Sequence, residues 1–144
     1  MLKQLVLPCL VIFFGHFAEA QSTITVAVRN FKNNNGTCLI CLYNNADAFV
    51  GKGEPLRKLK VSVSGKTASA VFEGLPAGTY AISVIHDANN NNQFDTNFIG
   101  IPTEGYGASQ NKLPFAAAPK FDDNKFSVGN NASASVNIRL RYLF

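Results

Sequence analysis

The sequence predicts an all-β protein: one domain built as a seven-stranded antiparallel β-sandwich, with one long loop after the fifth strand. Apolar and polar residues alternate along several segments, turn-forming residues separate these segments, and no segment shows a helical period. Short strands at this spacing are typical of a sandwich. We expect strands near residues 23–31, 36–43, 57–64, 66–73, 79–86, 120–128 and 133–142.

Residues 1–20 have the layout of a secretory signal peptide. Lys3 precedes an apolar run at 5–14, and the segment ends in the small-residue sequence AEA. The alternative is a membrane anchor, but about ten apolar residues are too short to cross a hydrocarbon core of about 30 Å. We therefore expect cleavage before Gln21 and export to the periplasm or the cell exterior. The mature chain, 21–144, is expected to be one β-sandwich domain without a membrane-spanning segment.

The first, third and last predicted strands show the clearest alternation. Apolar residues take every second position from Ile24 to Val28 and again from Ala134 to Tyr142. Strand 57–64 alternates in the same way and carries lysines, which is typical of an exposed sheet edge that resists pairing with other chains. The turn sequences NNNG, SGK, PAG and GNN separate the strands.

The second strand contains TCLICLY at 37–43, which is apolar on both faces. Either the long loop at 87–119, which we expect, or a partner protein covers its outer face. Cys38 and Cys41 point to opposite faces of an extended strand, about 10 Å apart, beyond disulfide reach. A zinc site would need further ligands that the mature chain lacks. We therefore expect two buried, reduced thiols.

The charge pattern and the motifs argue against two classes of function, nucleic-acid binding and catalysis. The net charge is +4, and the cations are scattered without a basic face or a recognised motif, so we expect no nucleic-acid binding. The chain has no nucleophile elbow, no glycine-rich phosphate loop and no complete zinc set, so we expect no enzyme.

The segment DANNNNQFD at 87–95 places oxygen-bearing side chains at alternate positions. With Asp87 as position 1, Asn89 and Asn91 take positions 3 and 5. Gln93 at position 7 offers its backbone carbonyl, and Asp95 takes position 9. This is the first part of the calcium loop D-x-[DN]-x-[DN]-G, in which a hard cation collects oxygen ligands.

The segment also departs from that loop at two positions. Asn92 replaces the glycine at position 6, and Phe98 stands at position 12 in place of a bidentate glutamate. Either Glu104 supplies a later carboxylate or ligation ends at Asp95, so calcium affinity is expected to be weak, about 10⁻⁴–10⁻³ M. The alternative is a metal-free turn held by side-chain to backbone hydrogen bonds. The sequence leaves both open.

Two further residues are candidates for ligand binding. His86, together with Asp87, Glu104 and Tyr106, has the groups of an acid–base or small-ligand site. Strand parity instead places His86 in the core, where it is expected to donate to a loop carbonyl. Tyr106 is either a platform for a sugar ring or peptide, or a lid over the end of the sandwich. As a lid it would form a secondary core with Phe94, Phe98 and Phe115.

The segment FEGLPAGTYAISVIHDANNNNQFDTNFIGIPTEGYGASQN, at 72–111, resembles the signature block of a family of exported bacterial proteins known as a domain of unknown function. That block has the pattern F-x-x-L-P-x-G-x-Y-A, a strand ending in H-D, then N-x-N-G-x-x-D and G-x-P-x-E-x-Y-G. The matching residues are Phe72, Leu75, Pro76, Gly78, Tyr80, Ala81, His86, Asp87, Asn89, Asn91, Asp95, Gly100, Pro102, Glu104, Tyr106 and Gly107. Asn92 departs from the pattern, which weakens the case for tight metal binding. The resemblance implies an exported β-sandwich similar to prealbumin-like and Cna-B-like modules, and no known activity.

The sequence thus favours an exported, non-enzymatic binding module with a weak Ca²⁺ site. Its expected partner is a cell-envelope component, a glycan or another exported protein. One alternative is an enzyme or small-ligand carrier with a site at His86, Asp87, Glu104 and Tyr106. Another is a structural subunit of a cell-envelope assembly, in which strand 37–43 packs against a partner.

Overall fold

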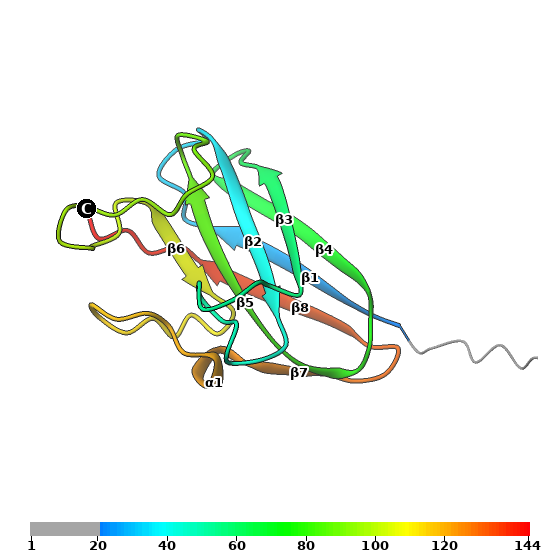
Figure 1. Cartoon of the computed structure of the whole chain (residues 1–144). Coiled ribbons are helices and arrows are strands. Elements are labelled where there is room, and N and C mark those ends of the chain that lie inside the picture. The colour runs from blue at the N-terminus through cyan, green and yellow to red at the C-terminus, as the bar shows by residue number, and fades with distance from the viewer. Residues whose placement is uncertain (1–20) are drawn as a thin grey trace, which may run out of the picture.

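The computed structural model describes residues 21–144 and shows eight strands in two sheets (Figure 1). The predicted signal peptide at 1–20 lies outside the described residues. Within 21–144, no helix is long and apolar enough to cross a membrane. The elements are β1 (Ser22–Arg29), β2 (Thr37–Tyr43), β3 (Arg57–Ser62), β4 (Thr67–Leu75), β5 (Gly78–Asp87), β6 (Gly105–Ala108), α1 (Phe121–Asn124), β7 (Phe126–Val128) and β8 (Ser133–Arg139).

The two sheets share one core, which gives a sandwich-like arrangement. One sheet has the order β4-β1-β8, and the other has the order β3-β2-β5-β6, with β7 also paired to β5. The predicted alternation is confirmed in β1, where Ile24, Val26 and Val28 are buried. They meet residues of the second sheet, including Ile40 and Ile82, in a single cluster. Burial of one such side chain contributes about 1.5–3 kcal/mol, so this cluster dominates the stability of the fold.

Three details of the predicted fold are wrong. An eighth strand, β6, lies inside the predicted long loop, because a four-residue strand containing two glycines is too short to show alternation. The sheet is not purely antiparallel, since β8 pairs with β1 in parallel. β7 pairs with β5 in the second sheet, and the chain then crosses to the first sheet and enters beside β1 in the same direction. The predicted strand 120–128 begins with the short helix α1.

The outer face of β2 is covered by the chain itself. Cys41 and Tyr43 are buried there against Phe49, with Leu113 and Phe121 packed alongside. The predicted cover from 87–119 is therefore correct for Leu113, while Phe49 and Phe121 come from other segments. Most of this face is therefore covered within the chain itself, and Leu39 is half-buried.

The two cysteines lie where the strand pattern predicts. Cys38 belongs to the core between the sheets and Cys41 to the outer cluster, and both are free and buried. Burial raises the pKa of the Cys38 thiol to about 12, which makes this thiol unreactive at neutral pH.

Candidate functional site

Two buried carboxylates close the loop that joins β5 to β6. Asp87 ends β5 and is 3% exposed, and Glu104 directly precedes β6 and is 7% exposed. The Asp87 carboxylate accepts the backbone N–H groups of Asn91 (3.1 Å) and Asn92 (2.9 Å). Neither Asp87 nor Glu104 forms an ion pair with any residue of the described chain. Both negative charges are thus held by backbone dipoles alone, which is costly for buried groups.

Glu104 links the two ends of the loop. Its carboxylate oxygens accept the backbone N–H groups of Ala88 (3.2 Å) and Asp95 (3.1 Å). Burial raises the pKa of Glu104, the two backbone N–H groups oppose this shift, and the nearby charges of Asp95 and Asp87 add to it. Protonation of Glu104 or a bound cation would relieve the same unfavourable charge.

The four consecutive asparagines divide into two pairs by the direction of their contacts. Asn89 and Asn91 face inward, and their amide nitrogens donate to the Asp95 carboxylate at 2.8 Å each. Asn90 and Asn92 have left-handed backbones, with φ of 57° and 60°. Asn92 therefore takes the conformation for which the calcium loop uses glycine at position 6.

The two outward asparagines tie the loop to the neighbouring strands. The Asn90 side-chain oxygen accepts from the Thr37 hydroxyl of β2 at 3.2 Å. The Asn92 oxygen accepts from the Lys60 ammonium of β3 at 2.6 Å. These two side-chain hydrogen bonds tie the loop to the second sheet.

The predicted ligands Asp87, Asn89, Asn91, Asp95 and Glu104 are thus joined in one hydrogen-bonded network. The side chain of Gln93 is exposed, and its backbone N–H donates to the side-chain oxygen of Asn91 at 3.0 Å. In the part of the chain that is described, no three His, Cys, Asp or Glu side chains form a metal-binding group. A cation would therefore need the side-chain oxygens of Asn89 and Asn91 as further ligands. Their amide nitrogens now face the Asp95 carboxylate, and rotating each amide by 180° would bring the oxygens to that side instead.

His86 lies in the core, as predicted, and is 1% exposed. Its Nε2 donates to the carbonyl of Asn35 at 2.7 Å, because a carbonyl oxygen only accepts. Nδ1 consequently accepts from the hydroxyl of Tyr142 at 2.8 Å. The carbonyl belongs to the β1–β2 connection instead of the long loop. His86 thus joins the β1–β2 connection to the segment that follows β8, and both of its ring nitrogens are engaged.

The structure separates His86 from Tyr106. Gly105 is registered opposite His86 and Tyr106 opposite Ile85, so the two side chains lie on opposite faces of the sheet. The four-residue acid–base set suggested by the sequence is therefore not assembled. Tyr106 instead packs edge-on against Phe94, with ring centroids 6.0 Å apart.

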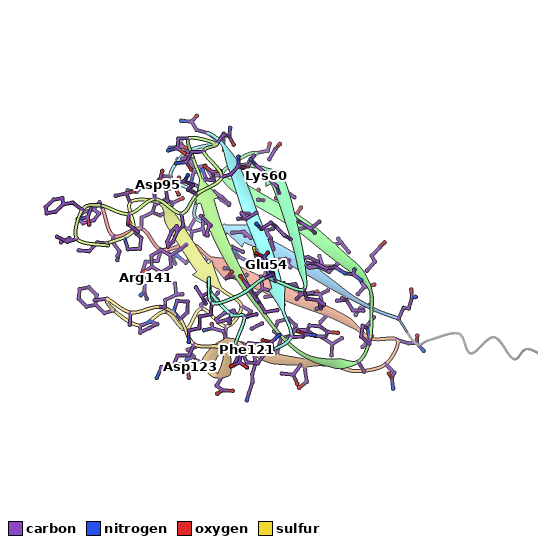
Figure 2. The ribbon with its side chains drawn as sticks, in the orientation of Figure 1. Glu54, Lys60, Asp95, Phe121, Asp123 and Arg141 are labelled. Carbon is purple, nitrogen blue, oxygen red and sulfur yellow. The ribbon has the colours of Figure 1, made fainter. Side chains whose placement is uncertain are left out.

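A short hairpin at residues 95–103 extends the loop away from the sheets; Asp95 marks its base in Figure 2. The backbone N–H of Thr103 donates to the Asp95 carbonyl at 3.0 Å, and the Asn97 side chain accepts from Ile99 and Ile101. At the tip, Phe98 is 99% exposed and Ile99 is 64% exposed.

The predicted secondary core is therefore mostly wrong. Phe94 packs against Tyr106, whereas Phe98 and Phe115 are exposed. The turn around Asn97 holds Phe98 at the hairpin tip, where the side chain is almost fully exposed. Residues 115–118, which are all exposed, likewise extend from the body on the same side as the hairpin (Figure 1).

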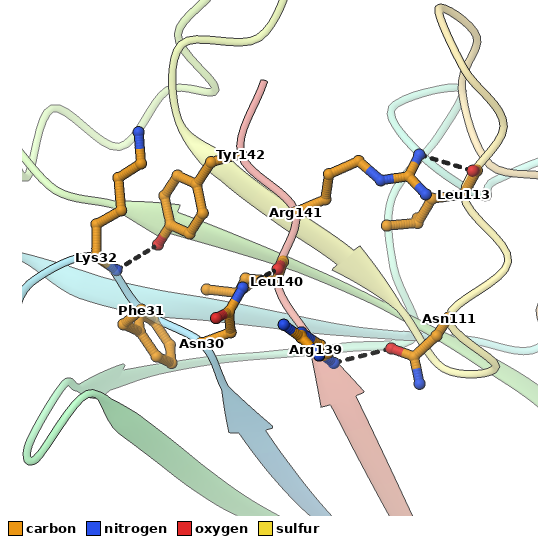
Figure 3. A pocket seen from close by; sticks show the side chains of 9 residues that line it. All are labelled: Asn30, Phe31, Lys32, Asn111, Leu113, Arg139, Leu140, Arg141 and Tyr142. Atoms are coloured by element: carbon orange, nitrogen blue, oxygen red, sulfur yellow. Dashed lines mark hydrogen bonds between the residues drawn. The ribbon is translucent and has the colours of Figure 1, made fainter. Parts of the chain in front are cut away.

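A cleft of about 580 Å³ lies near the end of β8 and was not predicted from the sequence. Figure 3 shows its side chains, which come from three segments that are far apart in the chain. In the sequence, the one local feature that belongs to this cleft is the pair of arginines in RLRY at 139–142. The lining residues are Asn30, Phe31, Lys32, Asn111, Leu113, Arg139, Leu140, Arg141 and Tyr142.

Comparison with known protein families gives one match. The family DUF2141, described as uncharacterized proteins conserved in bacteria, matches residues 26–136. Comparison with curated proteins and with solved structures gives no match. The matched range includes β2 to β7 and parts of β1 and β8, together with the loop at 87–104 and its hairpin, and it spans well over half of the 144 residues. The chain therefore belongs to the DUF2141 family of conserved bacterial proteins.

Proposed function

We propose that this protein is an exported, non-enzymatic binding module and that the hairpin at 95–103 is its contact surface. The observation that carries the proposal is the exposure of Phe98 and Ile99 at the tip of an ordered turn. Exposed large apolar side chains contribute nothing to the core and often mark interaction sites. Because hydrogen bonds already fix the hairpin, little conformational entropy is lost when it binds.

The chemistry of the tip bears on the class of partner. Among cell-envelope components, glycans and exported proteins, we favour an apolar groove on an exported protein. Phe98 and Ile99 offer apolar area and no side-chain hydrogen-bonding group, whereas glycan recognition needs polar groups as well. The signal-peptide layout of residues 1–20 supports encounter with such a partner outside the cytoplasm.

We further propose that weakly bound calcium holds the base of the hairpin. Asp87 and Glu104 are buried without a cationic partner, and Asp95 lies in the same network. The left-handed Asn92 supports the turn that such a loop requires. The role of calcium would be to fix the direction of the tip, because the buried carboxylates leave no open substrate position.

The environment of His86 supports a non-enzymatic role. General acid–base catalysis needs a ring nitrogen within hydrogen-bond reach of a substrate. Both nitrogens of His86 are engaged inside the core, and Tyr106 lies on the other face of the sheet.

The test compares the immobilised protein with a Phe98→Ser/Ile99→Ser variant. Leu56→Ser is the matched control, because Leu56 is also exposed but lies before β3. Purified exported proteins, lipid vesicles and cell-wall glycan from a bacterium that encodes the protein are passed over each surface separately. We expect the wild type and Leu56→Ser to retain one exported protein that the tip variant does not retain. Equal retention by the tip variant would contradict the proposed surface, and retention of vesicles or glycan alone would contradict the proposed partner.

A further inference from the structure

β8 is an outer strand of its sheet and pairs there only with β1. Just before β8, the Ala132 carbonyl accepts from the N–H of Thr23 at 3.0 Å. Just after it, the Leu140 N–H donates to the carbonyl of Arg29 at 3.0 Å. Even-numbered positions therefore direct their backbone groups at β1. Because this direction alternates along a strand, the odd-numbered residues of β8 direct theirs away from β1, toward an open edge.

A side chain already occupies one end of this edge. The Asn111 side chain donates to the Asn137 carbonyl at 3.0 Å and accepts from the Arg139 N–H at 2.8 Å. The rest of the edge is unoccupied: the N–H and C=O groups of Ser133 and Ser135, and the N–H of Asn137, have no hydrogen-bond partner within residues 21–144. The backbone of 133–137 is thus available to pair with another strand.

Three other sheet edges are protected. β3 carries cations at 57–60, and such charges discourage pairing with another chain. The Arg57 guanidinium also donates to two carbonyls of β4. On β6, Tyr106 exchanges two backbone hydrogen bonds with Arg141. The β8 edge differs, because residues 133–137 contain no charged side chain and no proline.

A groove of about 370 Å³ lies beside the open edge, between β8, β7 and residues 109–111. None of its lining side chains is charged. Phe126 of β7 and Ala134 of β8 line it and are only half-buried, so part of each side chain is free to contact a ligand. Ser135 and Asn137 line it as well. A strand added to β8 would therefore place every second side chain in the groove.

We propose that β8 accepts an extended segment of another exported polypeptide, which joins the sheet as a strand beside residues 133–137. The segment is uncharged and carries apolar residues at alternate positions, to match Phe126 and Ala134 in an uncharged groove. In this mode of recognition main-chain hydrogen bonds supply affinity, and alternate side chains supply specificity. The site includes no residue of the hairpin at 95–103 and goes beyond the function proposed for that hairpin.

A second copy of this chain suits the groove less well. If β8 paired with the β8 of another copy, that strand would keep Val136 buried in its own core, with Ala134 packed against that core. Neither side chain would then enter the groove of the first copy. A separate extended segment has no such commitment and fills the groove as it pairs.

The first test uses a peptide of about seven residues in which threonine or serine alternates with valine, acetylated and amidated at its ends. Because the main chain supplies the affinity, a generic peptide is a sufficient probe. We expect saturable binding by fluorescence anisotropy, together with slower amide exchange at Ser135 and Asn137 by NMR. The proposal would be overturned by no saturable binding up to about millimolar peptide, or by binding that leaves both exchange rates unchanged.

Two altered peptides separate the contribution of the backbone from that of the side chains. Methylation of the central backbone nitrogens removes main-chain donors, and replacement of the valines by glutamates places charge in the uncharged groove. We expect each peptide to bind at least about tenfold more weakly than the valine peptide. Equal binding of the methylated peptide would overturn strand addition, and equal binding of the glutamate peptide would overturn the uncharged segment.

Matched proline variants locate the binding edge on the protein. Ser135→Pro removes one outward N–H of β8, a position at which an edge strand tolerates proline. Ser69→Pro is the control, because Ser69 is an exposed serine of β4, at the opposite edge of the same sheet. We expect circular dichroism like that of wild type for both variants. Ser135→Pro should bind the valine peptide at least about tenfold more weakly, and Ser69→Pro should bind it like wild type. Equal weakening in both would overturn the site on β8.

Sedimentation of the protein without peptide tests the alternative occupant. We expect wild type and Ser135→Pro to have the same molecular mass in solution at all concentrations. A dimer of wild type that Ser135→Pro abolishes would show that a second copy pairs with β8, and would overturn the proposed partner.

Discussion

The acidic loop at 87–104 and the basic cleft near the end of β8 are built from the chain in opposite ways. The acidic loop is one continuous segment, and its carboxylates accept hydrogen bonds from backbone groups of that same segment. The cleft is lined by three segments that are distant in the sequence, and Arg141 from one of them donates to the carbonyl of Leu113 in another. Chemistry that is local in sequence can be recognised from spacing, whereas chemistry assembled by strand order cannot.

Tyr142 contacts both regions. It lines the cleft, and its hydroxyl donates to His86, the residue before Asp87. A side chain added at Gly105, the residue after Glu104, would overlap the Tyr142 ring. The two ends of the acidic loop and one wall of the cleft thus depend on the position of one aromatic ring.

The largest expected effect comes from Asp87→Ala, which breaks the acidic loop and leaves the cleft in place. Two N–H groups lose a charged acceptor, so the free energy of unfolding should fall by about 3 kcal/mol. Urea denaturation measures this loss, and hydrogen exchange should accelerate across 88–104 but not across 139–142. Asp122→Ala removes only an exposed pair with Lys125 and should cost less than about 1 kcal/mol. Equal losses in the two variants would show that Asp87 does not organise the loop.

Gly105→Ala should perturb both regions together. The new methyl group must displace the Tyr142 ring, which we expect to cost about 1–3 kcal/mol. Denaturation gives the loss, and near-ultraviolet circular dichroism reports the displaced tyrosine. At Gly129 the nearest atom to an added methyl is 3.9 Å away, so Gly129→Ala serves as the control. An unchanged tyrosine signal in Gly105→Ala would remove the link between the two regions.

The pH dependence of the acidic loop follows from Glu104. Because its pKa is raised above the ordinary value of 4.5, the folded protein holds this proton more tightly than the unfolded chain does. Its contribution to stability is therefore present below pH 4.5 and is lost as pH rises through the raised pKa. In EDTA, wild type should lose melting temperature relative to Glu104→Gln over that window. Parallel melting curves at all pH values would contradict the raised pKa.

The smallest effect on stability is expected at the hairpin tip. Phe98→Ser/Ile99→Ser should change the free energy of unfolding by no more than about 0.5 kcal/mol, because both side chains are exposed. Phe94→Ser removes the contact with Tyr106 and should cost about 1 kcal/mol. Urea denaturation separates the two. A large loss in the tip variant would mean that Phe98 and Ile99 serve the fold instead of a partner.

Most of the fold was predictable because alternation is a local signal. It placed β1, β2, β5 and β8 to within a few residues. It missed β6, which is held by its neighbours: a methyl group on Gly107 would lie 2.7 Å from Ile138. It also missed the parallel β1–β8 pairing, since strand order depends on which sheet each strand joins and not on its own pattern.

In the candidate site too, contacts between residues close in sequence were predicted and contacts between strands were not. The spacing of Asp87, Asn89, Asn91 and Asp95 predicted a network that the structure assembles. The pairing of His86 with Tyr106 was wrong, because a one-residue offset in the β5–β6 register places them on opposite faces. The cleft left almost no signal in the sequence.

The most direct test of the proposed calcium loop is thermal unfolding of the purified protein, first in EDTA and then with increasing calcium. Stabilisation by mass action gives about 1.4 kcal/mol at ten times the Kd, which corresponds to a rise of a few degrees. We expect this rise in wild type and in Asp122→Ala at about millimolar calcium. It should be absent in Asp87→Ala and Asp95→Ala. An unchanged melting temperature in wild type across the millimolar range would contradict the calcium site and leave the loop held by its asparagines alone.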